Sequence, residues 1–363
     1  MTTAADKSVC VTGASGYIGS WLVYYLLERG YTVHATVRDV NRKTEHLKRL
    51  AAEHKSRGGQ LVLHQADLLS AESFIEPIKQ CSVVYHTASP FQISQTGVSG
   101  QKRFIDPAVR GTENVLLACL QPETRQRLRR VVVTSSIAAV AGFYDQKPGD
   151  PVPVYDENDW NTTSTPRNDP YSYSKTEAER LAWRVATETR NKDKSWDLVT
   201  ILPGFVLGPS LTKETESGSV EFMQQLLGGR LAMGAPAWQQ SVVDVRDVAI
   251  AHLRAGSDRQ VPSGRYILVA ESKSILNIAA ALRNEWGHRF RLPQRELPKW
   301  LVYLAGPFVG LSWETIRHRV GLPIRLNTAK SKTLLGMEYR DMNRSIVEHA
   351  QQMIADGLVT LRP

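Results

Sequence analysis

The stretch Ser8-Val-Cys-Val-Thr12-Gly13-Ala-Ser-Gly16-Tyr-Ile-Gly19, near the start of the chain, decides the fold. A short β-branched run leads into three glycines spaced three residues apart, and an apolar helical stretch follows. Glycine at these points permits a tight turn, a close backbone approach to a pyrophosphate and close packing of helix on strand. The helix start offers N–H groups and the positive end of its dipole to the anion. The order predicts a dinucleotide site, although its spacing is one residue longer than Gly-x-Gly-x-x-Gly; a purely structural turn is the alternative.

The chain continues this strand–helix alternation to about residue 200. The expected strands lack clean polar alternation, which is typical of strands that are covered on both faces. They are Ser8–Thr12, Tyr31–Val37, Gln60–Ala66, Ser82–His86, Arg130–Ser135 and Leu198–Leu202, and the helices between them include Tyr17–Glu28, Lys43–Lys55, Ala108–Leu120 and Tyr171–Thr187. Short links imply right-handed crossovers, so the expected fold class is α/β, a Rossmann-type doubly wound parallel sheet.

Beyond Pro203 the pattern changes, because glycine and proline become frequent. Two further strands, Ser241–Val245 and Gly264–Val269, enclose a helix from Asp247 to Arg254, and the remainder is mainly helical, ending in Arg344–Asp356. We therefore expect two interlaced domains. The dinucleotide domain comprises residues 1–204 and 240–272, and a smaller, mostly helical C-terminal substrate domain comprises 205–239 and 273–363.

The composition indicates in which cellular compartment the protein is expected and which kinds of partner are not expected. The chain has 363 residues and a net charge of +9, but its basic residues are dispersed, so no nucleic-acid partner is expected. Three scattered cysteines, with no Cys-x-x-Cys and no His pair at ligand spacing, predict reduced thiols and no metal. The start lacks a secretory signal, and the apolar stretch Trp300–Trp313 is shorter than the ~20 residues that a membrane-spanning helix needs. We expect a cytoplasmic protein without a membrane span, and surface attachment through Trp300–Trp313 stays open.

A cation at the end of the second expected strand indicates which dinucleotide is bound. The strand ends Ala35-Thr-Val-Arg38-Asp39, with Arg42 and Lys43 close behind. An NAD site places a carboxylate here for the ribose 2′-hydroxyl, whereas an arginine suits a 2′-phosphate. The sequence therefore predicts NADP(H). In the alternative, Arg38 is a solvated charge and Asp39 faces the ribose.

A proton-transfer group is predicted at Tyr171-Ser-Tyr-Ser-Lys175. Residues i and i+4 share one helix face, so the phenol and the ammonium point into the same space. A nearby cation stabilises phenolate, and we expect Lys175 to lower the pKa of Tyr171 and to prepare it for proton transfer. Ser136, at the end of an expected strand, could hydrogen-bond the same substrate oxygen. The alternatives are a surface Tyr/Lys pair and a serine that only caps.

These motifs, together with Leu202-Pro-Gly-Phe-Val-Leu-Gly-Pro209, resemble the extended short-chain dehydrogenases/reductases. The similarity is greatest to the branch of dihydroflavonol, cinnamoyl-CoA and carbonyl reductases. It rests on Val37-Arg38-Asp39, Tyr85-His-Thr-Ala-Ser-Pro90, Pro107-Ala-Val-x-Gly-Thr112 and Asn327-Thr-Ala-Lys with Leu335-Gly. The resemblance covers nearly the whole chain.

The resemblance implies roles for individual residues. Tyr171 would be the acid/base, Lys175 its pKa partner and ribose anchor, and Ser136 the group that polarises the carbonyl. The implied cofactor contacts are Gly13, Gly16, Tyr17, Ile18 and Gly19 at the pyrophosphate, Arg38 and Lys43 at the 2′-phosphate, Asp67 and Leu68 at adenine, Thr87, Ala88 and Ser89 beyond the fourth strand, and Pro203 and Val206 beside the nicotinamide. The chain departs from the pattern at Ala108, where many relatives carry an asparagine that completes a proton relay.

The expected activity is NADPH-dependent reduction of an aldehyde or ketone to the alcohol. Candidate substrate contacts are apolar or aromatic for the most part, which favours a hydrophobic or aromatic carbonyl compound, and core packing is the alternative for each. They are Phe91, Gln92, Phe205, Phe222, Met223, Leu226 and Trp238. Alternative functions are a nucleotide-sugar epimerase or dehydratase, a hydroxysteroid dehydrogenase, and a non-catalytic NADP(H) sensor. The expected partner is a small molecule, and the protein is expected to be a monomer or a homodimer.

Overall fold

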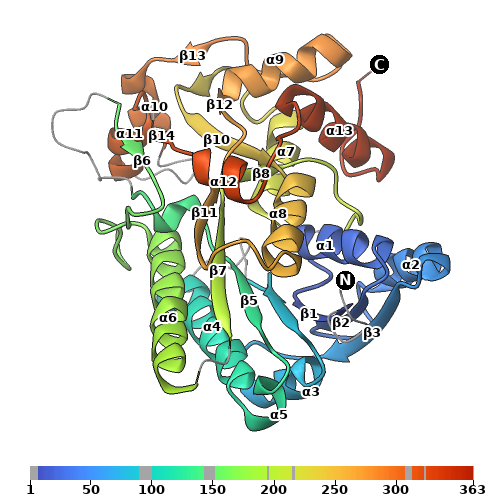
Figure 1. Ribbon diagram of the computed structural model, residues 1–363. Coiled ribbons are helices and arrows are strands. Elements are labelled where there is room, and N and C mark those ends of the chain that lie inside the picture. The colour runs from blue at the N-terminus through green and yellow to red at the C-terminus, as the bar shows by residue number, and fades with distance from the viewer. Residues whose placement is uncertain are drawn as a thin grey trace.

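A seven-stranded parallel sheet forms the centre of the fold (Figure 1). The computed structural model describes residues 7–89, 100–142, 152–193, 196–214, 217–306, 313–322 and 324–362. The strand order is β11-β7-β5-β4-β1-β2-β3. The strands are β1 (Ser8–Thr12), β2 (Thr32–Val37), β3 (Gln60–Gln65), β4 (Val83–His86), β5 (Arg130–Thr134), β7 (Asp197–Pro203) and β11 (Gly264–Leu268). The predicted fold class is confirmed, and each of these strands lies within a residue or two of its predicted position.

Helices cover both faces of this sheet (Figure 1). On one face, α1 (Tyr17–Glu28) packs against α2 (Glu45–His54) and α8 (Val245–Ser257). On the other, α4 (Asp106–Cys119) packs against α6 (Pro170–Asp193). Short helical segments link these elements: Lys55–Arg57, Ala71–Phe74, α3 (Ile75–Ile78), Gln101–Ile105, α5 (Pro122–Arg125) and Ile137–Ala139.

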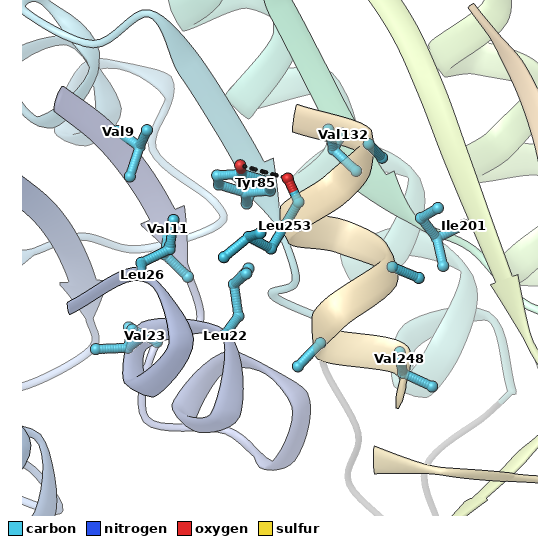
Figure 2. Close-up of a cluster of buried hydrophobic side chains, with 14 of the residues drawn as sticks. Val9, Val11, Leu22, Val23, Leu26, Tyr85, Val132, Ile201, Val248 and Leu253 are labelled. Atoms are coloured by element: carbon cyan, nitrogen blue, oxygen red, sulfur yellow. Dashed lines mark hydrogen bonds between the residues drawn. The ribbon is translucent and has the colours of Figure 1, made fainter. Parts of the chain in front are cut away.

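Burial on both faces explains the continuous apolar strands. Successive side chains of a strand point to opposite faces. Val9 and Val11 pack under α1 and α8, with Leu22 and Tyr85 (Figure 2), while Cys10 lies in the core beneath α4 and α6. No position of β1 could therefore be exposed and polar without losing packing on one face.

The order of the strands reverses between β1 and β4, which places a crevice at their carboxyl ends. The chain runs outward from β1 to β3 on one side and from β4 to β11 on the other. Two hydrogen bonds join the loops at this point: Thr87 Oγ1 donates to Thr12 O at 2.7 Å, and Ala88 N donates to Thr12 Oγ1 at 3.3 Å. In open α/β sheets, ligands bind at such a reversal.

A second unit is built on a three-stranded sheet, which the sequence pattern did not predict. In it β10 (Gln239–Asp244) pairs in parallel with β8 (Phe205–Leu207) and antiparallel with β12 (Glu271–Ser274). The strand predicted at Ser241–Val245 is β10, whereas β8 and β12 were not predicted, because β8 has only three residues and β12 is wholly polar. The helices α7 (Gly218–Leu227), α9 (Ile275–Trp286) and α13 (Met342–Ala355) contribute to its core. The exact division of the chain into two domains stays a prediction.

The remaining elements are small. They are the strand pairs β9 (Ala235–Pro236) with β13 (Glu296–Leu297) and β6 (Val154–Tyr155) with β14 (Arg325–Leu326), and the helices α10 (Lys299–Ala305), α11 (Trp313–Arg319) and α12 (Ala329–Leu334). In the parts of the chain that the structure describes, no helix is both long and apolar enough to cross a bilayer.

Candidate active site

The glycine loop between β1 and α1 is held tightly against the end of β4. Gly13 has φ +66°, and a Cβ there would lie 2.7 Å from the Cα of Ala88. Gly16 N donates to Gly13 O at 3.0 Å and closes the turn. A Cβ at Gly19 would collide with the carbonyl oxygen of Gly13, so α1 can approach the loop only without a side chain at that point.

The start of α1 is suited to an anion. Gly16 precedes the helix in an extended conformation, no described side chain caps it, and the first turn carries no acidic residue. The first-turn N–H groups therefore keep their capacity to bind a phosphate oxygen. The glycine cradle and this helix start fit the pyrophosphate of a dinucleotide.

The side chain of Tyr17 ties α1 to the second unit. Its hydroxyl donates to Gly208 O, and Trp21 Nε1 donates to Pro209 O at 2.8 Å. Burial raises the pKa of Tyr17 well above its usual value. Any pyrophosphate contact of Tyr17 would therefore come from its backbone N–H, and Ile18, partly buried, packs against the core.

Arg38 lies exposed directly after β2. It makes no hydrogen bond or ion pair with any residue that the structure describes. Asp39, by contrast, accepts a hydrogen bond from Asn41 N at 2.9 Å through Oδ1, within its own turn. Lys43 is exposed and adopts φ +56°, which is unusual for a residue with a side chain. This arrangement fits a 2′-phosphate site at Arg38 better than a ribose hydroxyl site at Asp39.

The other predicted cofactor residues lie at the carboxyl ends of the sheet. Asp67 follows β3, and its Oδ1 accepts from Leu69 N at 2.9 Å. Leu68 O accepts from Asn114 Nδ2 of α4 at 2.7 Å, which fixes this turn. Pro203 ends β7 and Val206 lies in β8, where both are buried.

The structure brings the predicted catalytic trio together. Tyr171 and Lys175 lie one turn apart on α6, and the Ser136 side chain, just beyond β5, is near enough to Tyr171 to lower the pKa of its phenol. Lys175 Nζ lies 5.9 Å from the centroid of the Tyr171 ring and donates to Ser89 Oγ at 2.8 Å. Ser136 Oγ also accepts from Ala138 N at 3.1 Å, so capping and the contact to tyrosine coexist.

The expected effect of Lys175 on the pKa of Tyr171 is wrong for the protein alone. Burial raises the pKa of the Tyr171 phenol, the hydrogen bond from Ser136 opposes this only in part, and Asp169 adds to it. Burial also lowers the pKa of Lys175 to about 8. Desolvation is the largest of the effects on Tyr171, because the phenol has left water. Tyr171 therefore carries its proton at neutral pH.

A small hollow lies behind Lys175, and Ala108 forms part of its wall. Its other lining residues come from β4, α4, β5 and α6: His86, Ala88, Ser89, Thr112, Val133, Thr134, Ser135, Lys175, Ala178 and Glu179. Burial, reinforced by the charge of Lys175, lowers the pKa of His86 to about 3, so this imidazole is neutral.

The predicted substrate residues that the structure describes divide into two groups. Phe205 and Phe222 are partly buried with their rings edge to face at 5.4 Å, and Trp238 lies with its ring 5.7 Å from the guanidinium of Arg319. Met223 and Leu226 expose no surface at all, so the core-packing alternative fits them. The remaining two, Phe91 and Gln92, lie outside the described residues.

Two neighbours of the trio were not predicted. Asp169 Oδ1 accepts from Ser172 N at 3.1 Å and so caps α6 immediately before Tyr171. Glu179, one turn beyond Lys175, is buried among polar partners. An acidic residue before a helix, and a third polar residue at the same helical spacing, are the signals that could have indicated them.

A dinucleotide crevice with serine, tyrosine and lysine at its edge defines the short-chain dehydrogenases/reductases, and the added sheet and helices are typical of the extended members. Residues 9–270 match the NAD dependent epimerase/dehydratase family, and the chain belongs to this family.

Similar proteins cluster in one branch of it. A cinnamoyl-CoA reductase of Medicago truncatula is 36% identical over 351 residues, which cover 95% of each chain. A bifunctional dihydroflavonol 4-reductase/flavanone 4-reductase of Malus domestica is 34% identical over 288 residues, 77% of each chain. The structure of yeast methylglyoxal/isovaleraldehyde reductase complexed with NADPH superposes with a TM-score of 0.77 at 26% identity, over 97% of this chain and 100% of that one. The predicted resemblance to this branch is confirmed.

Proposed function

We propose that the protein is an NADPH-dependent reductase that converts a hydrophobic aldehyde or ketone to the alcohol. The observation that carries the proposal is the grouping of Tyr171 and Lys175 on one face of α6 with Ser136 just beyond β5, all at the strand ends. This gives two hydroxyls directed at one point, next to the glycine loop that would hold the cofactor.

The two hydroxyls would share the substrate oxygen. Ser136 holds and polarises the carbonyl, and Tyr171, which is protonated at neutral pH, gives its proton to the oxygen as charge develops there. The dihydronicotinamide, when bound, supplies the hydride that adds to the carbonyl carbon. Lys175, already held by Ser89 at 2.8 Å, would then stabilise the phenolate until Tyr171 regains a proton from solvent.

The cofactor assignment rests on Arg38. Its guanidinium is exposed at the end of β2 and can form a bidentate contact to a phosphate. The solved relative that binds NADPH supports the same choice. The pyrophosphate would lie on the N–H groups that follow Gly16.

The substrate class is inferred from aromatic side chains beyond β7. Phe205, Phe222 and Trp238 form a partly buried apolar surface on the second unit. Two of the named relatives are reductases of cinnamoyl-CoA and of dihydroflavonols, which are aromatic, and the yeast relative reduces the aliphatic aldehydes methylglyoxal and isovaleraldehyde. Together with the aromatic side chains, the two aromatic cases favour an aromatic or otherwise hydrophobic carbonyl compound here.

A substrate screen tests the proposal. NADPH oxidation is followed at 340 nm with aromatic aldehydes, β-ketoesters, dihydroflavonols and acyl-CoA thioesters, and with UDP-sugars as the comparison. We expect stoichiometric NADPH consumption with at least one carbonyl compound. Conversion of a UDP-sugar without net consumption would instead establish an epimerase and contradict the proposal.

A further inference from the structure

A buried ion pair lies on the catalytic face of α6, one turn beyond Lys175. Glu179 accepts hydrogen bonds from four side chains, which lie directly after β5, in β7, in β11 and on α6 itself. The donors are Ser135 Oγ at 2.7 Å, Thr200 Oγ1 at 2.7 Å, Arg265 Nε at 2.8 Å and Trp183 Nε1 at 3.4 Å. A carboxylate with this many donors fixes the helix against three strands at once.

Arg265 is held as firmly as its partner. Besides Glu179, its guanidinium donates to the carbonyl oxygens of Glu157 at 2.9 Å and Asp159 at 2.5 Å. Its other face stacks on the ring of Trp160 at 3.7 Å. Arg265 therefore joins α6 to the segment 157–160, which lies between β6 and α6, and the pair is buried, with side-chain exposures of 8% for Arg265 and 0% for Glu179.

The pair also faces the catalytic groups. Tyr171, Lys175 and Glu179 lie at i, i+4 and i+8 and so share one face of α6. Glu179 and Lys175 line the same hollow, and Ser135, which donates to Glu179, directly precedes Ser136. Of the other residues that line this hollow, His86 of β4 is the one that can take a charge, and it is neutral because burial lowers its pKa to about 3.

We propose that the Glu179–Arg265 pair is a positioning element of the active site, which sets α6 against β5 so that Tyr171 meets Ser136, and which leaves no net charge behind Lys175. The second half follows from the geometry of the pair: two opposite charges, buried and 2.8 Å apart, compensate each other. The consequence for turnover rests on the proposed reductase function.

Glu179→Gln tests this by leaving Arg265 as an uncompensated cation. A new positive charge favours phenolate at Tyr171 and disfavours ammonium at Lys175, so the pKa of either group falls. The apparent pKa of the pair, read from the pH dependence of kcat for carbonyl reduction, should fall by on the order of one pH unit. The double variant Glu179→Gln/Arg265→Met has no net charge change and should restore the wild-type value.

A matched control is available at the other end of the same strands. Arg130 of β5 pairs with Asp197 of β7, at 2.7 Å, at the amino ends of these strands and away from the crevice. Asp197→Asn also replaces a carboxylate by an amide and leaves a buried arginine. It should lower thermal stability as Glu179→Gln does, without moving the apparent pKa.

Two readouts keep the inference independent of the proposed function. The pH dependence of NADPH affinity, followed by fluorescence, reports on Lys175 without a substrate, and it should shift in the same direction. If the wild-type protein reduces no carbonyl compound, the proposed function fails and this binding profile decides the inference alone.

If Glu179→Gln does not fold, Arg265→Gln leaves the carboxylate uncompensated and should raise the apparent pKa. Loss of stability with an unmoved apparent pKa in the folded variants would overturn the proposal.

Discussion

Tyr171 is neutral at physiological pH because burial opposes the phenolate more strongly than its hydrogen bond from Ser136 supports it. A protonated phenol is the form that a carbonyl reduction needs, since the step consumes a proton at the substrate oxygen. Lys175, in contrast, has its pKa lowered by burial to about 8, so it loses its charge only slightly above neutral pH. The two residues together favour reduction at neutral pH and alcohol oxidation at higher pH, where phenolate becomes accessible.

Arg38 is expected to determine the choice between NADPH and NADH. Arg38→Gln removes a charge-assisted contact to the 2′-phosphate, so KM for NADPH should rise about 10- to 100-fold while KM for NADH stays unchanged. Steady-state kinetics with both cofactors measure this. Arg49→Gln, an exposed arginine on α2, is the control. An equal loss with both cofactors would show that Arg38 does not contact the phosphate.

At the scale of single elements, local sequence patterns predict some of the site residues, such as the glycines between β1 and α1. They do not predict contacts between residues that are far apart in the sequence. The glycine spacing, the tyrosine–lysine spacing and Ser136 follow from local patterns, and the structure brings these residues to one edge of the sheet. The Glu179–Arg265 contact joins α6 to β11 across 86 residues of sequence, so no local periodicity encodes it. The polar strand β12 was missed for a related reason, because it is specified by pairing with β10 and not by its own side chains.

Gly13→Ala tests the loop as an element. The substitution forces a side chain into φ +66° and against the backbone of Ala88, so the free energy of unfolding should fall by about 1–3 kcal/mol and NADPH binding should weaken. Urea denaturation and fluorescence titration measure the two effects. Gly58→Ala is the matched control, since Gly58 has φ +83° and open space around it, and it should lose stability with unchanged NADPH affinity. Unchanged affinity in Gly13→Ala as well would contradict the cradle.

At the scale of the whole molecule, buried imidazoles link folding to pH. His86 lies in the main sheet, His252 on α8 and His349 on α13 of the second unit, and all three are buried. Burial lowers the pKa of His252 and of His349 to about 4, and that of His86 to about 3. The folded state therefore resists protonation that the unfolded chain accepts near pH 6.5.

The sign of the pH dependence follows from these lowered values. Stability is fully present above pH 6.5 and is lost as pH falls toward 4, by on the order of 2 kcal/mol per histidine at pH 5. Urea denaturation at pH 7.5 and pH 5 measures the difference, and His252→Gln should reduce it. His252 donates through Nδ1 to Val248 O at 2.8 Å in its neutral form, so the variant also costs stability at pH 7.5. Equal stability at the two pH values would refute the assignment of neutral buried imidazoles.

The central claim is that Tyr171 delivers the proton in an NADPH-dependent carbonyl reduction. The most direct measurement compares Tyr171→Phe with the wild-type protein, using the best carbonyl substrate from the screen. The variant keeps the ring and loses only the hydroxyl, so kcat should fall by about a hundred- to ten-thousandfold, while the dissociation constant for NADPH stays within about twofold, well under 1 kcal/mol. Full turnover in Tyr171→Phe would contradict the account.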